Sequence, residues 1–147
     1  METTSKQNDK KKLNLKTIVG LAFGLIVAIL VQQYFFKPPS FDKQMMQVAS
    51  ELNKTCPIMV DTETQLDNAV ALPEKTFQYN YTLINMYKDS IDIERLEEYL
   101  KPVILNTIKT NPDLKSFRDN NVVMSYNYKD KNSTHVLKLI FTPDQYK

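Results

Sequence analysis

The side chains best suited to covalent catalysis in this chain are its single cysteine, Cys56, and its single histidine, His135. A thiolate with an imidazole as its base can act as a nucleophile, and residues distant in sequence can meet in a fold. The structural alternative is a small thiol beside Pro57 at the end of a helix, with a polar histidine in a hairpin. A lone cysteine in an oxidising compartment could also pair with a second chain. We favour the structural interpretation and keep a tethered thiol enzyme using Cys56 and His135 as the alternative.

A second candidate site is a segment in which oxygen-bearing side chains alternate: Asp61, Glu63, Gln65 and Asp67. Alternating oxygen ligands are typical of calcium-binding loops. Such loops also need a glycine at the sixth position and a glutamate at the twelfth, and leucines stand at both positions here. The segment is better explained as a capped turn that leads into a strand, so we predict no metal site.

Glycine is almost absent from the chain, and both glycines, Gly20 and Gly24, lie in one apolar run. Phosphate-binding loops, dinucleotide fingerprints and the Gly-x-Ser-x-Gly turn all need glycine backbone conformations or close approach. A zinc site of histidines and cysteines needs more of them than one chain supplies here. These absences argue against the common catalytic machinery, and we expect no enzymatic activity, no catalytic residues and no cofactor.

Residues 53–85 contain the motif Cys56-Pro57-x-x-Val60-Asp61-x-x-Thr64-x-Leu66-Asp67, followed by Tyr79-x-Tyr81-Thr82-Leu83. This motif resembles a pattern found in small uncharacterised bacterial proteins with an N-terminal signal or membrane anchor. The resemblance implies no activity, but it implies that the Cys-Pro corner and the following turn are a shared structural or ligand-contacting feature. The candidate partner-contact turn consists of Cys56, Pro57, Asp61, Thr64 and Asp67.

The longest apolar element that could position such a domain runs over residues 17–36, between Lys16 and Lys37. As a helix, this uncharged run is about 30 Å long, which matches the hydrocarbon core of a bilayer. No small-residue cleavage site follows it, and a buried core helix of this length and all-round apolarity is unusual. The sequence therefore predicts an uncleaved, single-pass signal-anchor.

Lysines around this run predict its orientation. Five lysines lie in residues 1–16 and two in residues 37–52, and Lys-rich flanks stay in the cytoplasm. We expect a basic cytoplasmic tail, residues 1–16, and an extracytoplasmic (periplasmic or extracellular) domain, residues 37–147. The excess positive charge is confined to the tail, which indicates contact with lipid headgroups and not with nucleic acid.

Small residues repeat every four positions within the predicted transmembrane helix, at Gly20, Gly24 and Ala28. This spacing lets two helices approach closely in lipid. It also arises by chance in apolar helices. It is compatible with a homodimer or with pairing to another membrane protein.

The outer domain is predicted to be α+β, with an antiparallel sheet and two or three helices on one of its faces. Apolar spacing indicates helices over 41–53 and 93–108, the second with a kink or break at Pro102, and a short helix over 112–119. Period-two patterns indicate strands over 65–72 and 77–83 and a hairpin from 122 to 141.

Tyrosines recur at period two on two of these strands: Tyr79, Tyr81, Tyr126 and Tyr128. If the strands adjoin, the rings form a cross-strand cluster that is either core or an exposed recognition face, and we favour core. Without catalytic machinery, the preferred function is a membrane-anchored binding or assembly module. Its partner would be another membrane or extracytoplasmic protein.

Overall fold

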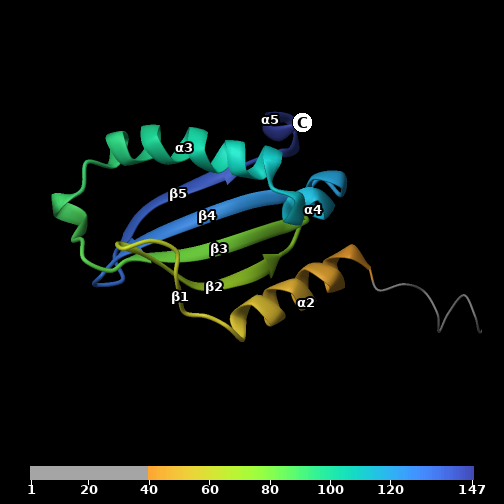
Figure 1. Ribbon diagram of the computed structural model, residues 1–147, viewed down its shortest axis with the longest axis horizontal. Coiled ribbons are helices and arrows are strands. Elements are labelled where there is room, and N and C mark those ends of the chain that lie inside the picture. Colours follow the sequence, from red (N-terminus) through yellow and green to blue (C-terminus); the bar gives the residue numbers. More distant parts are fainter. Residues whose placement is uncertain (1–39) are drawn as a thin grey trace, which may run out of the picture. The chain divides into compact units, whose positions relative to one another are not determined.

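The computed structural model describes residues 40–147, a compact unit that begins just after Pro38 (Figure 1). The predicted basic tail and transmembrane helix, residues 1–36, lie outside the described residues. Among residues 40–147, no helix is both long and apolar enough to cross a membrane.

Five strands and several helices make up the domain. In chain order they are α2 (Phe41–Asn53), β1 (Ile58–Met59), β2 (Thr64–Leu72), β3 (Thr76–Leu83), the 3₁₀ turn η1 (Lys88–Ser90), α3 (Ile93–Thr110), the 3₁₀ turn η2 (Pro112–Leu114), α4 (Lys115–Asp119), β4 (Val123–Asp130), β5 (His135–Phe141) and α5 (Pro143–Tyr146). The helices and strands predicted for the outer domain are all present. The two-residue strand β1, the turn η1 and the C-terminal helix α5 were not predicted.

The sheet follows the order of the sequence, β1-β2-β3-β4-β5, but it is mixed and not purely antiparallel as predicted. Strands β3 and β4 run parallel, with Phe77 opposite Met124, whereas the other neighbours are antiparallel. The reason is the connection between β3 and β4. It contains α3, which carries the chain back along the sheet before β4 begins, and such crossovers join parallel strands.

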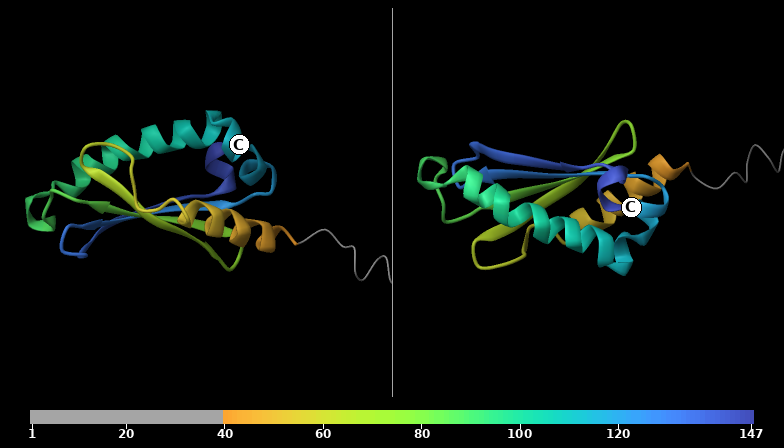
Figure 2. Two further views of the ribbon diagram at one scale, coloured as in Figure 1. Left: turned by 60° about the horizontal axis from the view of Figure 1, so that its bottom comes forward. Right: turned by 90° about the horizontal axis from the view of Figure 1, so that it is seen from above.

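Both long helices lie on the same side of the sheet, as the sequence predicted (Figure 2). Met45 and Ala49 of α2 and Ile104 and Ile108 of α3 belong to one core cluster with the side chains of that face. Phe77 at the centre of this core is completely buried. The intervening residues of each strand point to the opposite face, which no helix among the described residues covers.

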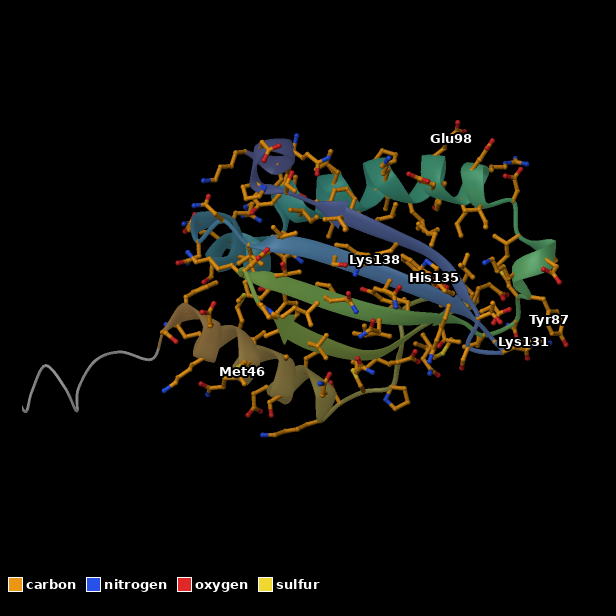
Figure 3. All side chains as sticks on the ribbon, turned by 180° about the vertical axis from the view of Figure 1, so that it is seen from behind. Met46, Tyr87, Glu98, Lys131, His135 and Lys138 are labelled. Carbon is orange, nitrogen blue, oxygen red and sulfur yellow. The ribbon has the colours of Figure 1, made fainter. Side chains whose placement is uncertain are left out.

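That open face is polar and extensively hydrogen-bonded. Asn80 donates to the Asn68 side chain over 2.7 Å and accepts from Gln78 over 2.8 Å and from Asn127 over 3.2 Å. Figure 3 looks onto this face and labels Lys138 on β5. These side-chain hydrogen bonds pair the polar groups of a face that borders solvent. The period-two alternation therefore separates a buried apolar face from a solvent-facing polar one.

Helix α2 closes an edge of the sheet. Strand β1 pairs only with the beginning of β2, and beyond it the side chain of Asn53 takes the place of a neighbouring strand. Its amide donates to the Ala69 carbonyl oxygen over 2.9 Å, and its Oδ1 accepts from the Ala69 N–H over 2.7 Å. Backbone groups that a longer β1 would have paired are therefore satisfied by the helix.

Helix α3 runs unbroken from Ile93 to Thr110, although Pro102 lies inside it, so the predicted break does not occur. Asp92 caps its first turn by accepting from the Arg95 N–H over 3.1 Å. Proline cannot donate to the carbonyl four residues earlier, which here belongs to Glu98. Glu98 and Pro102 both lie on the exposed face, where water can reach that carbonyl.

Candidate binding groove

A large concave site borders the helix side of the sheet, between α3 and the segment 60–64 that joins β1 to β2. It is an open pocket of about 740 Å³. That volume is in the usual range of ligand sites. Its lining residues are Val60, Asp61, Glu63, Thr64, Tyr81, Leu83, Met86, Leu96, Tyr99, Leu100, Val103, Ile104, Thr107, Tyr126 and Tyr128.

Stacked tyrosines form the floor of this groove. The parallel register places Tyr79 beside Tyr126 and Tyr81 beside Tyr128, with ring centroids 5.2 and 5.0 Å apart. The predicted cross-strand cluster is confirmed, and it belongs to the core, since Tyr126 and Tyr128 are only 7% and 5% exposed. Its upper surface nevertheless lines the groove, because Tyr81, Tyr126 and Tyr128 are all lining residues.

Burial of the phenols makes them hard to ionise. It raises the pKa of Tyr79 to about 12, and together with the charge of Asp61 it raises the pKa of Tyr128 to about 12. The pKa values of Tyr81 and Tyr126 are raised as well, first by burial and then by the neighbouring tyrosines. The floor therefore stays neutral at physiological pH and offers apolar ring surface with phenolic hydroxyls.

One wall of the groove is an apolar stripe along α3. Leu96, Leu100 and Ile104 recur at helical spacing and turn toward the core cluster. Next to them Tyr99 is 68% exposed and Val103 is 48% exposed. The helix therefore has a wider apolar stripe than its own core requires, and the surplus faces the groove.

The opposite wall is a tight turn held by the carboxylate of Asp61. Its Oδ1 accepts from the backbone N–H groups of Glu63 over 2.8 Å and of Thr64 over 2.7 Å. The N–H of Val60 donates to the Thr64 carbonyl oxygen over 2.9 Å, and Val60 itself is 53% exposed. The sequence prediction of a capped turn leading into a strand is thus confirmed.

The structure divides the predicted partner-contact turn. Asp61 and Thr64 line the groove, whereas Asp67 faces the open side of the sheet. There Asp67 accepts from Thr82 over 2.6 Å and forms an ion pair with Lys129 over 3.3 Å. Burial alone would raise the pKa of Asp67, but these contacts outweigh it and the pKa is lowered. Asp67 therefore acts as a structural ion on a β-bulge, not as part of the groove.

Cys56 and Pro57 form the corner before β1, joined by a cis peptide bond. Cys56 is half-buried, and burial, followed by the charge of Asp67, raises the pKa of its thiol. His135 begins β5, at the other edge of the sheet (Figure 3). Four strand spacings, or about 19 Å, separate the two edges. The fold does not bring the thiol to the imidazole, so the nucleophilic pair is not formed.

Gly20, Gly24 and Ala28 lie outside the described residues. Within residues 40–147, no group of three or more histidine, cysteine or acidic residues could hold a metal ion.

Sequence reasoning missed the α3 wall. The signal that could have revealed it is the apolar pair Tyr99 and Val103, which continues the helical stripe past the width needed for packing.

A family model described as "Domain of unknown function (DUF8479)" matches residues 40–138, about two thirds of the chain. The chain therefore belongs to the DUF8479 family. The match ends within β5, so it includes both walls and the tyrosine floor of the groove. No curated protein sequence is significantly similar to this chain.

Solved structures share the fold at low sequence identity. A candidate secreted protein from Pseudomonas aeruginosa has 12% identity and a TM-score of 0.59 over 72% of this chain and 92% of that chain. The pilotin EpsS of the Vibrio vulnificus type 2 secretion system has 8% identity and a TM-score of 0.56 over 72% of this chain and 91% of that chain. The type II secretion pilotin AspS of Vibrio cholerae has 12% identity and a TM-score of 0.54 over 71% of this chain and 90% of that chain. These likenesses establish the fold.

Proposed function

We propose that this protein is a non-enzymatic binding or assembly module that holds a segment of a partner protein in the groove between α3 and the 60–64 turn. One observation supports this most directly. Three apolar side chains that line the groove, Val60, Tyr99 and Val103, are exposed to solvent and do not belong to the core. Exposed apolar surface beside a preformed cleft is typical of protein-interaction sites.

The fold comparison adds support for an assembly role. Two of the similar structures are pilotins of type II secretion systems, and neither carries more than 12% identity, so the likeness concerns shape. A domain of this shape outside the cytoplasm, tethered by a helix over residues 17–36, would hold its partner at the outer face of the membrane. The stripe of Gly20, Gly24 and Ala28 would add contacts within the bilayer.

Site-specific photocrosslinking in intact membranes tests the groove. A photoreactive phenylalanine analogue at Val103 should yield a discrete adduct with a partner protein, because this position faces the groove. The matched position is Lys138, which is exposed on the open polar face. Adding the exposed-site substitution Tyr99→Ser should weaken the adduct from position 103.

The proposal fails if position 138 captures the same protein as position 103, or if position 103 captures none. Both positions are exposed in the folded domain, so neither analogue should disturb folding. Equal thermal unfolding of the two labelled proteins is the control.

A further inference from the structure

The groove is mostly apolar, and the charged side chains that line it are acidic and lie together at one rim. Of its 15 lining residues only Asp61 and Glu63 carry charge, and both are carboxylates. The groove has two apolar sides and a single charged side, so an occupant would meet negative charge at one edge only.

Neither carboxylate forms an ion pair within residues 40–147. Ion pairs elsewhere in that region occupy other acids, such as Glu97 with Lys101 over 2.8 Å and Asp119 with Lys115. One oxygen of Asp61 holds the turn, while its Oδ2 makes no hydrogen bond to the described residues. The rim therefore has unused capacity to accept hydrogen bonds and to attract a positive charge.

We infer that the groove recognises a partner segment that combines apolar side chains with a lysine or arginine. The apolar side chains would lie between Val103 and the tyrosine floor, and the cation would pair with Asp61 and Glu63. This inference rests on the proposed function, because it names the chemistry of the segment held in the same groove.

The acidic rim would let the groove distinguish apolar segments that carry a cation from those that do not. A partner that covers the rim without a cation removes water from two carboxylates and forms no ion pair with them. The desolvation of these charges then lowers the binding affinity without compensation. A partner with its own carboxylate adds repulsion. Apolar contact supplies affinity, and the acidic rim selects among apolar segments and fixes their orientation.

Peptide selection tests this inference. The full chain is placed in phosphatidylcholine nanodiscs and used to select binders from a library of displayed 12-residue peptides. Peptides that bind empty nanodiscs are removed first. Selected peptides should be enriched in apolar residues together with lysine or arginine. Asp61→Asn combined with Glu63→Gln should weaken their binding about fivefold, since each exposed charge pair contributes modestly. Both replacements keep the shape, and asparagine can still accept at Oδ1, so the turn is retained.

Glu98→Gln is the matched control, because Glu98 is an exposed acid of α3 that does not line the groove (Figure 3). It should leave binding unchanged. Raising salt from about 0.05 to about 0.5 M should weaken binding to the unmodified chain more than binding to the doubly neutralised one.

The outcomes separate the two proposals. If Val103→Ser weakens binding while the double neutralisation does not, or if selected peptides lack cations, the inference about the cation is overturned and the groove remains the proposed binding site. If Val103→Ser also has no effect, or if no peptide is selected, the groove is rejected as the binding site. A crosslink from position 103 to a second copy of the chain would give the groove another occupant and overturn the inference.

Discussion

Asp130 connects two loops that are far apart in the sequence. It is 3% exposed, and its Oδ2 accepts from the Lys88 backbone N–H over 3.0 Å. Its Oδ1 accepts from the backbone N–H groups of Asn132 over 2.9 Å and Thr134 over 2.8 Å. These bonds, first among them the one from Lys88, lower the pKa of the carboxyl. One charged side chain thus fixes the β4–β5 turn against the segment before α3.

Replacing this residue, Asp130→Asn, should destabilise the domain, because an amide N–H would face the donor of Lys88. Since the folded pKa lies below the unfolded one, the stabilisation is complete above the ordinary carboxyl pKa and is lost as pH falls through the folded pKa. The urea midpoint of the variant should therefore lie below that of the unmodified protein at pH 7, and the gap should narrow below about pH 4. Asp89→Asn, at a nearby exposed acid, should change little. A gap that is independent of pH would contradict this.

The tyrosine cluster predicts sensitivity to alkali. The folded pKa values of Tyr79 and Tyr128 are raised to about 12, so the contribution of these residues is intact below the unfolded pKa near 10. It is lost as pH rises from about 10 toward 12. Tyr126→Phe, which keeps the ring and removes one ionisable hydroxyl, should reduce this loss. Thermal unfolding between pH 8 and pH 11.5 measures this loss of stability in both proteins. Identical dependence of the melting temperature on pH in the two proteins would contradict the prediction.

At the scale of elements, α3 has two roles, since it packs against the core and also forms one wall of the groove. Leu96, Leu100 and Ile104 pack toward the core, while Tyr99 and Val103 extend the groove wall. Pro102 is inside this helix, on its exposed face and outside the groove lining. The structure keeps the helix continuous because the face that loses a hydrogen bond is exposed, not because proline favours it.

Pro102→Ala should therefore stabilise the domain by about 1–3 kcal/mol, since alanine restores the helical hydrogen bond and has the best helix propensity. Urea unfolding followed by circular dichroism gives the free energy of unfolding. Lys109→Ala on the same helix is the control and should change it by less than about 0.5 kcal/mol. Equal or lower stability of the proline variant would show that the residue is accommodated without cost.

The pattern of residues predicted these elements well and their pairing poorly. Alternation in 76–83 and 123–130 reveals which side chains share a face, because that depends only on neighbours in the chain. It carries no information about direction, so the parallel β3–β4 pair and the mixed sheet could not be foreseen. The groove was missed for the same reason. Its walls come from α3 and the 60–64 turn, which only the crossover brings together.

At the scale of the whole molecule, the proposed tether determines where the groove operates. Single-cysteine labelling tests its orientation without relying on proteolysis of a stable fold. In a Cys56→Ala background, Asn132→Cys lies in an exposed loop of the domain, and Thr3→Cys lies in the predicted basic tail. In intact cells a membrane-impermeant maleimide should label position 132 and not position 3.

Permeabilised cells, in which both positions should react, provide the control. The full-length chain should also stay in the membrane after an alkaline carbonate wash. Labelling of position 3 in intact cells, or release by carbonate, would remove the anchor from the proposal.

The sheet joins two contiguous stretches of chain at one seam. Residues 40–83 supply β1 to β3, residues 93–141 supply α3, β4 and β5, and the only strand ladder between them is β3–β4. The ring stacks of the tyrosines cross that seam. If the connector 84–92 opens, two copies can exchange halves and rebuild the same sheet without a new contact. A high local concentration would favour such an exchange, and the aromatic seam is what would hold the swapped pair together.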